Sequence, residues 1–467
     1  MPAGAARAVA TSDDPASATD SGGHRRLAAL GLHRRELRAW ALYDWANSAF
    51  ATTIMAAVFP IFYVNVAAAD LPANVATARF AFTTAGALAL VALLTPVLGA
   101  VADYLGAKKR LLGSFLALGV LATATMFLIG EGAWLFASLV FVLGNVGFSG
   151  SIIFYNSLLP HIAREGEMDR ISTAGYALGY LGGGLLLAIN LAWILAPGTF
   201  GLADAAVATR LSFVSVAVWW LGFSLPLLRR VPEPPRQLEP DEVVGLNPVR
   251  VGVTRLAETL REIRGYRQAF LFLLAFLAYN DGIGSIIKMA TVYGTEIGLE
   301  QTHLIGAILL VQFVGIPFAF LFGLLARRLG AKRSIYLALT VYVVVSVLGY
   351  FMTSALHFYL LAILVGTVQG GSQALSRSLY ASLIPRHKSS EFFAFFAVGD
   401  KFAGILGPAI FGWVSLATGS SRLSIVALIG FFVVGMALLT RVDVRSGQRY
   451  ARQADRDVHT LPVAATP

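Results

Sequence analysis

Six ionisable side chains lie inside stretches of this 467-residue chain that are otherwise apolar. A charged group at membrane depth costs at least a few kcal/mol, so it normally faces a cavity or a partner of opposite charge. There, carboxylates can take up and release protons, and fixed cations can hold the anionic part of a solute. These residue types therefore indicate proton exchange and charge-selective binding inside a membrane. The six are Asp44, Asp281, Lys288, Arg377, Asp400 and Lys401.

Asp281 is the most isolated carboxylate of this set. It lies near the middle of the apolar segment 268–293, and so near mid-membrane. Because desolvation disfavours the charged form of a carboxylate, Asp281 is the first candidate for a proton-coupling site. Lys288 lies near the outer end of the same segment, where a long side chain snorkels to the interface. Asp44, by contrast, is roughly 7 Å from the cytoplasmic end of its segment and marks the rim of the path.

Arg377 and Asp400 lie at similar depths in two consecutive apolar segments, 357–384 and 392–417. Each is about 12 Å from the cytoplasmic end, at a rise of about 1.5 Å per residue. Consecutive segments are neighbours, so we predict an Arg377–Asp400 ion pair with charge-assisted hydrogen bonds. The pair is either a permanent structural link or part of a gate, with Lys401 beside it. Asp400 is also a second candidate for proton coupling.

Uncharged polar residues follow helical spacing near these charges. Gln369, Gln373 and Arg377 share one face of the segment 357–384. Such stripes either bind a solute or hold helices together by hydrogen bonds, and both interpretations stay open. The candidates for the substrate path are Tyr43, Asp44, Asn47, Asn145, Asn156, Tyr279, Asn280, Gln369, Gln373 and Arg377.

The elements that must position these residues are membrane-spanning helices. The chain is 57% hydrophobic and 13% charged and has no cysteine, and its mean hydropathy of +0.71 is far outside the range of soluble domains. A helix needs about 20 mostly apolar residues to cross roughly 30 Å of hydrocarbon. Twelve segments meet this condition: 40–66, 79–102, 111–130, 133–159, 172–196, 210–228, 268–293, 303–326, 334–353, 357–384, 392–417 and 422–440.

The basic residues predict the orientation of these helices. Of 36 lysines and arginines, only Arg79, Arg210 and Arg422 fall in the loops that lie outside when both chain ends are placed inside. Lysine and arginine concentrate in cytoplasmic loops, so we expect both ends in the cytoplasm and the protein in the cytoplasmic (inner) membrane. This topology accounts for the net charge of +10, and no nucleic-acid partner is expected.

Polar segments divide the chain into two groups of six spans. Residues 1–39 are predicted to be a disordered cytoplasmic tail without a signal peptide, with a short interfacial helix at 27–38. The linker contains an apolar stripe that predicts an amphipathic helix, either on the membrane surface or in solvent. The expected parts are the tail 1–39, the bundle 40–228, the linker 229–267 with its stripe Val249, Val253, Leu256, Leu260 and Ile263, the bundle 268–440 and the tail 441–467.

The two halves share an internal repeat. "GAVADYLGAKKR" (99–110) recurs as "GLLARRLGAKR" (323–333), "YNSLLPHI" recurs as "YASLIPRH", and "ALYDWANS" more weakly matches "LAYNDGIGS". Three matches in the same order indicate a parallel repeat, in which both six-helix halves have the same orientation. The first match aligns Gly99, Gly106 and Lys108 with Gly323, Gly330 and Lys332.

These motifs resemble those of the major facilitator superfamily. The loop after the second span resembles its Gly-x-x-x-Asp-x-x-Gly-x-basic-basic signature, with Asp103 at the acidic position, whereas the second copy carries Arg327 there. "YDWANSAF", "FYNSLLP", "GGSQALSRSLYASLIP" and "GDKFAGILGPAIFG" are similar to the bacterial Unknown Major Facilitator family, which is related to the fungal vacuolar amino-acid effluxers of the autophagy pathway.

The resemblance implies a fold and a gate. The fold is that of an all-α polytopic membrane protein, with twelve transmembrane helices in two pseudo-symmetric six-helix bundles (the major facilitator fold). For Asp103 the resemblance implies a role in a cytoplasmic gate. The alternative for this loop is that its glycine, acidic and basic residues only build a tight turn.

Together with the buried charges, the resemblance predicts a secondary active transporter. We expect it to move a small polar metabolite by alternating access, coupled to protons, and the resemblance implies amino-acid efflux. The alternatives are transport of another solute, such as a drug or a sugar, or a membrane receptor or scaffold on the same fold. No lysine follows a glycine as a Walker loop requires, and no His-Glu-x-x-His motif occurs, so neither a pump nor an enzyme is expected. We expect no cofactor and a monomer in the bilayer.

Overall fold

The computed structural model describes residues 27–164, 166–236, 246–262, 265–402, 406–418 and 421–460. Within them every regular element is a helix, as expected from the sequence. The first half and the linker contain α2 (Arg35–Ala49), η1 (Phe50–Ala57), α3 (Phe59–Phe62), η2 (Tyr63–Ala67), α4 (Ala73–Leu105), α5 (Lys108–Thr125), η3 (Met126–Leu128), α6 (Trp134–Ile162), α7 (Met168–Leu195), η4 (Pro197–Phe200), α8 (Ala205–Arg230) and α9 (Pro248–Glu262). The second half contains α10 (Arg267–Glu296), α11 (Gln301–Leu329), α12 (Ala331–Tyr350), α13 (Ala355–Leu383), α14 (Ser389–Phe402), α15 (Leu406–Thr418), α16 (Ser421–Ala427), α17 (Ile429–Thr440) and α18 (Val444–Thr460).

In the part of the chain that the structure describes, eleven helices are long and apolar enough to cross a membrane. The first, Arg35–Ala67, joins α2 to two π-helical stretches, and the last, Arg422–Thr440, joins α16 to α17. The remaining expected span, 392–417, consists of the shorter helices α14 and α15, and residues 403–405 between them lie outside the described residues. All twelve expected segments are therefore helical where they are described.

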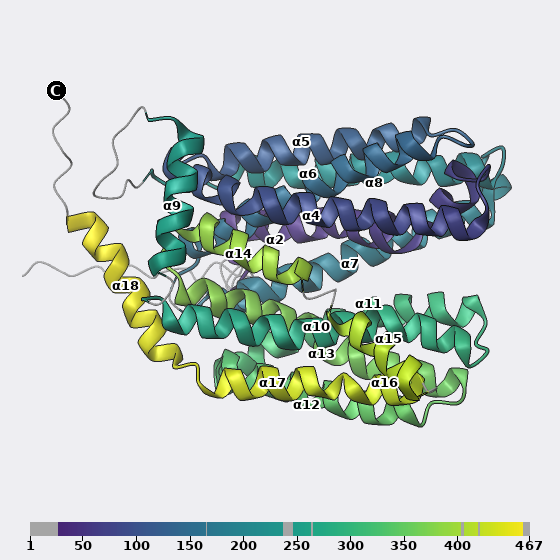
Figure 1. The fold of residues 1–467 in the computed structure, drawn as a ribbon. Coiled ribbons are helices and arrows are strands. Elements are labelled where there is room, and N and C mark those ends of the chain that lie inside the picture. Colours follow the sequence, from purple (N-terminus) through teal and green to yellow (C-terminus); the bar gives the residue numbers. More distant parts are fainter. Residues whose placement is uncertain are drawn as a thin grey trace, which may run out of the picture.

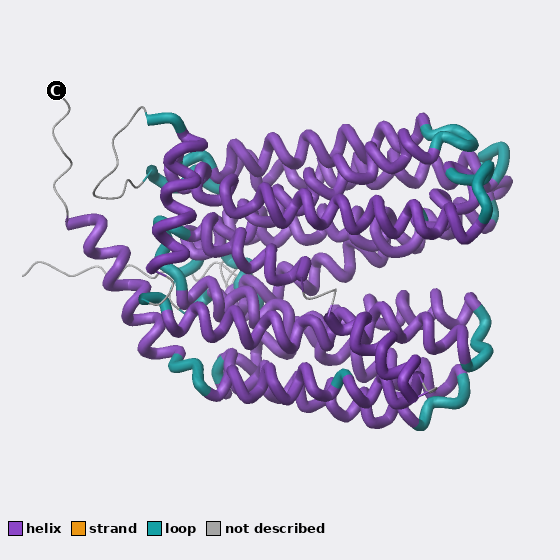
Figure 2. The backbone as a smooth tube through the Cα atoms, viewed as in Figure 1, coloured by secondary structure: helices purple, strands orange, loops and turns teal. Residues whose placement is uncertain are grey.

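The helices form two bundles that lie side by side (Figures 1 and 2). The N half is built from α2 to α8 and the C half from α10 to α17. At one end of both bundles lie α9 and α18, together with the α4–α5 and α11–α12 loops, and we call this the basic end (Figure 1). The two loops turn at Gly106 and Gly330, whose φ angles of 59° and 84° are ones that favour glycine.

The internal repeat also appears in how the two halves meet. A Cβ atom on Gly99 of α4 would lie 2.6 Å from the carbonyl oxygen of Ser390 in α14. A Cβ atom on Gly323 of α11 would overlap the hydroxyl of Thr173 in α7. Each half therefore presents a glycine of its second span to the fifth span of the other half, and only a residue without a side chain permits so close an approach.

The segment before α2 is anchored to the loop between α6 and α7. Arg34 donates to Glu167 Oε2 at 2.6 Å and to the carbonyl of Ile162 at 2.9 Å. Although burial opposes ionisation, the backbone N–H of Arg164 and the charge of Arg34 hold the pKa of Glu167 below its ordinary value. The anchor is therefore complete at neutral pH and weakens only as the pH falls through that lowered pKa. The expected helix at 27–38 is present only in part, since residues 27–29 are helical and α2 begins at Arg35.

The linker helix α9 packs on α4 through Val251 and Gly252. Val251 is 8% exposed, and a Cβ atom on Gly252 would lie 2.7 Å from the side chain of Val101. Val253, which belongs to the expected stripe, is 52% exposed. Gly252 lets α9 approach α4 closely. The other four residues of the expected stripe lie outside the described side chains, so the placement of the stripe stays a prediction.

Candidate functional site

Arg377 reaches from the C half into a pocket of the N half. It lies on α13 with its side chain 5% exposed, and its Nη2 donates to Asp44 Oδ2 of α2 at 3.0 Å. Its Nε donates to the hydroxyl of Ser172 on α7 at 2.8 Å, and Nη2 donates to the carbonyl of Ser172 at 2.9 Å. Its Nη1 lies 3.5 Å from Asn156 Oδ1 on α6. Three helices of the N half thus satisfy one cation of the C half by charge-assisted hydrogen bonds.

Three aromatic rings surround this guanidinium. Its central carbon lies 4.5 Å from the ring centre of Tyr176, 4.8 Å from that of Trp40 and 5.5 Å from that of Tyr155, distances at which cation–π attraction acts. Trp40 and Tyr155 stack with ring centres 4.3 Å apart, and the indole N–H donates to the carbonyl of Tyr155 at 2.9 Å. Asp44 and the three rings form what we call the cation box, and Arg377 fills it.

Helical spacing assembles this box from short stretches of sequence. Trp40 and Asp44 are four residues apart on α2, and Ser172 and Tyr176 are four apart on α7, so each pair lies on one helix face. Gly175 completes the fit. A Cβ atom there would overlap Asp44 Oδ2 and lie 3.0 Å from Arg377 Nη2.

We expect Gly175→Ala to reduce transport by tenfold or more, because the added methyl group forces Asp44 and Arg377 apart. Overpacking of this kind costs about 1–3 kcal/mol, so the melting temperature should also fall. The measurements are solute flux in proteoliposomes and thermal unfolding of the purified protein. Gly222→Ala on α8 is the matched control, since a Cβ atom there meets nothing within 4 Å. Equal flux in both variants would contradict the contact at Gly175.

The structure pairs Arg377 with a carboxylate of the other half. The sequence predicted a pair with Asp400 in the next span, whereas the carboxylate that the structure places against Arg377 is Asp44, 333 residues away. The reason is that Arg377 points across the interface between the halves instead of along its own bundle. The side chains of Asp400, Lys401 and Lys288 lie outside the described part of the chain, so their expected roles stay predictions.

A cavity of about 610 Å³ lies between the halves, on the side of this ion pair away from the basic end. Met55 of η1 and Tyr180 of α7 line it from the N half, and Gln312 and Gln369 line it from the C half. The cavity wall is mostly apolar, so its few polar groups, which also include Tyr293 and Ser346, are the ones that can orient a solute there.

The polar stripe of α13 leads from this cavity to the ion pair. Gln369 lines the cavity and lies eight residues before Arg377, which is about 12 Å along the helix axis. Between them, Gln373 donates to Asn280 Oδ1 of α10 at 2.6 Å. Tyr180, four residues after Tyr176 on α7, lies beside this stripe. The expected residues Gln369, Gln373, Asn280 and Arg377 therefore lie between the cavity and the ion pair, and their role in a substrate path stays a prediction.

Other expected path residues lie in contacts within one half. Tyr279 shares a hydrogen bond of 2.5 Å with Ser376, which joins α10 to α13. Asn145 donates to the carbonyl of Phe141 on its own helix at 2.9 Å. Tyr43 is fully buried against Tyr155, with ring centres 4.8 Å apart. These contacts give the three residues a packing role, next to the path.

Asn47 and Asn156 stay close to the ion pair. Asn47 is 4% exposed, lies one helical turn from Asp44, and its amide nitrogen has no hydrogen-bond partner within the described residues. Asn156 is 8% exposed and faces Arg377. Both amides can therefore accept or donate to a solute that reaches this point.

Asp103 lies in the contact that closes the basic end. It pairs with the buried Lys108, and its Oδ2 accepts the backbone N–H of Glu391 at 2.9 Å, in the first turn of α14. The ammonium of Lys108 also donates to the hydroxyls of Ser389 at 2.9 Å and Ser390 at 3.2 Å. A carboxylate of the N half thus caps a helix of the C half and interacts favourably with its dipole.

Asp281 lies fully buried on α10 and contacts the start of α15. Its Oδ2 accepts the backbone N–H of Gly407 at 3.0 Å. This contact links Asp281 to the backbone of the expected span 392–417. Its expected role in proton coupling stays a prediction.

The aromatic part of the site was not predicted from the sequence. Trp40, Tyr155 and Tyr176 lie in apolar segments, where aromatic residues normally signal core packing. A usable signal was present, because each of these rings lies within four residues of a polar residue of the site. Without the pairing of α13 with α2 and α7, however, that spacing does not indicate which cation the rings face.

Comparison with known proteins gives a consistent result over nearly the whole chain. The family model described as "Vacuole effluxer Atg22 like" matches residues 32–452. The uncharacterized MFS-type transporter YxiO of Bacillus subtilis is 37% identical over 421 residues, which cover 90% of this chain and 97% of that protein. Autophagy-related protein 22 of Yarrowia lipolytica is 29% identical over 62% of this chain and 52% of its own length.

Solved structures agree on the fold. The proton:xylose symporter XylE superposes with a TM-score of 0.63 at 14% identity, over 89% of this chain and 96% of that one. The transporter FucP in its outward conformation gives a TM-score of 0.61 at 13% identity, over 88% and 100%. The two-bundle arrangement of this chain is therefore the major facilitator fold, as the sequence motifs implied.

Proposed function

The chain belongs to the Atg22-like vacuole effluxer family, and we propose that this transporter moves small zwitterionic metabolites, amino acids above all, by alternating access. The observation that carries this proposal is the cation box of the N half with a cation of the C half inside it. A carboxylate among three aromatic faces suits an ammonium group, and a guanidinium suits a carboxylate. A zwitterion carries both of these groups.

In the described conformation Arg377 acts as the substitute for the ammonium group of the substrate. When the halves separate at the basic end, Arg377 leaves the cation box with the C half. The ammonium group of an amino acid then enters the box beside Asp44, and its carboxylate binds Arg377. The halves then close at the basic end, behind the bound substrate, and the substrate moves toward the cavity. When the substrate has left for the cavity, the ion pair forms again.

The proposed direction is efflux across the cytoplasmic membrane, with both chain ends in the cytoplasm. Support for the orientation comes from the lysines and arginines gathered at the basic end. Support for efflux comes from the family description. In the described conformation the basic end is closed by Asp103 and Lys108, and the cavity lies on the opposite side of the ion pair.

The test of this function is flux of a labelled panel of amino acids, sugars and organic cations in proteoliposomes, with and without an imposed pH gradient. We expect zwitterionic amino acids to exchange faster than the other two classes. A preference for a sugar or an organic cation would overturn the zwitterion assignment, and no movement of any solute under any gradient would overturn transport of these classes.

Proton coupling is proposed at Asp281, which is buried at mid-membrane depth. We expect Asp281→Asn to abolish accumulation driven by the pH gradient while exchange of labelled amino acid continues. The amide oxygen can still accept the N–H of Gly407, so this hydrogen bond should survive. Asp70→Asn, in an exposed loop, is the control. If the pH dependence of accumulation is the same in both variants, Asp281 does not carry the proton.

A further inference from the structure

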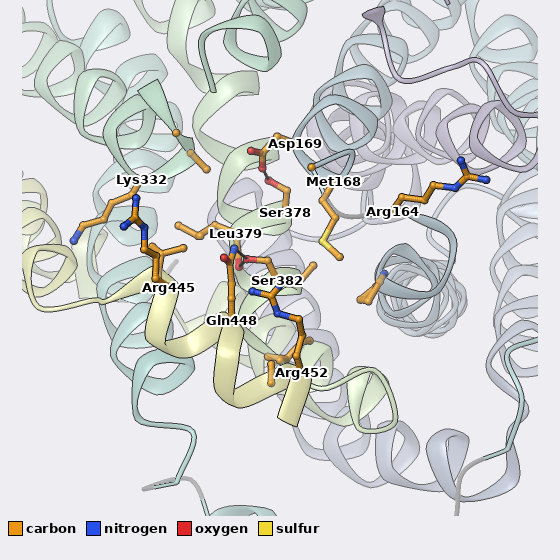
Figure 3. Close-up of a pocket in the computed structure, with 18 of the residues that line it drawn as sticks. Arg164, Met168, Asp169, Lys332, Ser378, Leu379, Ser382, Arg445, Gln448 and Arg452 are labelled. Atoms are coloured by element: carbon orange, nitrogen blue, oxygen red, sulfur yellow. Dashed lines mark hydrogen bonds between the residues drawn. The ribbon is translucent and has the colours of Figure 1, made fainter. Parts of the chain in front are cut away.

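The two junctions between the halves at the basic end are built differently. At the first, Asp103 and Lys108 of the α4–α5 loop fill the contact with the start of α14, and both side chains are buried. At the second, Gly323 of α11 packs against Thr173 of α7, as Gly99 packs against Ser390 at the first. Beside it, however, between the α11–α12 loop and the start of α7, lies a cavity of about 620 Å³ (Figure 3).

This cavity lies where the repeat lacks its carboxylate. Arg327 occupies the position equivalent to Asp103, and it does not line the cavity. Lys332, the equivalent of Lys108, donates to the carbonyls of Thr440 at 3.2 Å and Val442 at 2.8 Å instead of to a carboxylate. At the second junction the repeat therefore supplies no carboxylate in the place that Asp103 fills at the first.

Cations gather around the space that is left. Six arginines and lysines line the cavity, against two aspartates. Arg164 comes from the N half, and Arg445 and Arg452 come from α18, next to Ser382 and Gln448 (Figure 3). The preference for basic residues in cytoplasmic loops explains their number. They come from separate elements, and Arg452 is the cation that Figure 3 shows beside Ser382 and Gln448.

Both aspartates of this cavity are held by the chain itself. Asp169 accepts the hydroxyl of Ser378 at 2.5 Å, a contact between α7 and α13 that Figure 3 shows. Asp455 accepts the backbone N–H of Arg386 at 2.8 Å and lies 3.0 Å from His387 Nδ1. The net charge that the cavity presents to a ligand is therefore positive.

We propose that this cavity binds a phosphate-bearing anion, which supplies the negative charge that Asp103 supplies at the first junction. Its volume is within the range of small-molecule sites, about 300–1,000 Å³. Arginine guanidiniums form bidentate hydrogen bonds with phosphate oxygens, and Gln448 and Ser382 add uncharged polar groups. The anion is either the headgroup of an anionic lipid or a soluble phosphate compound.

The cavity is lined by Arg164 of the N half and by Arg445 and Arg452 of α18, which packs on the C half. A ligand that fills it therefore favours closure of the basic end. This consequence rests on the proposed alternation of the two halves. Binding itself does not, so a binding measurement can succeed or fail independently of transport.

Binding is tested on the purified full-length protein by thermal unfolding with sodium pyrophosphate, against sodium sulfate at equal ionic strength. We expect pyrophosphate to raise the melting temperature of the wild type, and Arg445→Gln and Arg452→Gln each to weaken its apparent affinity about tenfold. Arg449→Gln is the matched control, an exposed arginine of α18 that does not line the cavity. It should change the affinity less than twofold.

A second arm distinguishes the source of the phosphate. The protein is reconstituted in phosphatidylcholine with or without phosphatidylglycerol, and closure is measured as the distance between spin labels on Arg230→Cys and Arg441→Cys, which the cysteine-free chain permits. Phosphatidylglycerol that shortens this distance in wild type and the Arg449→Gln background, but not in Arg445→Gln, identifies a lipid headgroup. An effect of pyrophosphate alone identifies a soluble anion. Equal responses of Arg445→Gln and Arg449→Gln, or no response to either compound, would overturn the proposal.

Discussion

Arg377→Gln is expected to abolish transport, with a loss of at least a hundredfold in amino-acid flux. The substitution leaves Asp44 buried without its cation and removes the group proposed to bind the carboxylate of the substrate. Breaking a buried ion pair costs about 3–5 kcal/mol, which corresponds to a factor of a hundred or more in an equilibrium. The measurements are flux in proteoliposomes and the label distance between Arg230→Cys and Arg441→Cys. Arg328→Gln, an exposed arginine on α11, is the control and should transport normally.

Exchanging the two charges separates a structural pair from a substrate site. In Asp44→Arg/Arg377→Asp the pair can form again, so the label distance of the closed basic end should return toward that of the wild type. Transport should not return, because the aromatic faces then surround a fixed cation and repel the ammonium group of the substrate. Full recovery of flux in the exchanged protein would show that the pair only holds the halves together. Arg377→Lys gives a second comparison, since it keeps the charge but cannot reproduce the paired contacts with Ser172.

Asp103→Ala should open the basic end. Lys108 is 3% exposed and would lose its carboxylate, and the backbone N–H of Glu391 would lose its acceptor. An unpaired buried charge costs about 3–5 kcal/mol, so the closed form should lose its advantage by roughly a hundredfold or more. The label distance at the basic end should lengthen, and transport should fall because the protein no longer closes there.

The double variant Asp103→Ala/Lys108→Ala tests the reason for this effect. Removing both charges leaves only the uncapped N–H and a small void, so the label distance should recover in part. No recovery would mean that the helix cap, not the ion pair, holds the junction. Asp204→Ala is a control for loss of a cap alone, since Asp204 caps α8 at an exposed position through the N–H of Val207 at 2.8 Å. It should leave the label distance unchanged.

The helical fold was predictable because hydrocarbon leaves a spanning segment few choices. Every backbone polar group must be satisfied within the segment, so a long apolar stretch becomes a helix. The contact between Asp281 and the expected span 392–417 was less visible. Gly407 and Pro408 follow Asp281 by more than a hundred residues, and only the packed bundle shows that Asp281 accepts the N–H of Gly407. The contact of α9 with α4 was not visible either, because Gly252 carries no side chain to enter an amphipathic pattern.

The candidate site was also predictable from the sequence only in part. Buried charges such as Arg377 and Asp44 stand out in the sequence because each is costly in a membrane wherever it lies. Their pairing does not stand out, because a helix of uniform apolar composition carries little information about its rotation or its neighbour. Sequence proximity favoured Asp400, whereas packing of the halves brought Asp44 to Arg377. The aromatic rings around them were hidden for the same reason, since rings are equally stable in lipid and in a core.

The sequence by itself determined the helices and the internal repeat and singled out the charged residues, since apolar length, glycine spacing and the cost of buried charge act locally. Only the tertiary structure decided which charges meet across the interface of the halves. It also decided that one junction is closed by Asp103 while its counterpart, with Arg327 in the equivalent position, stays a cavity lined by cations. Such contacts depend on how two bundles face each other, and no short stretch of either bundle encodes that.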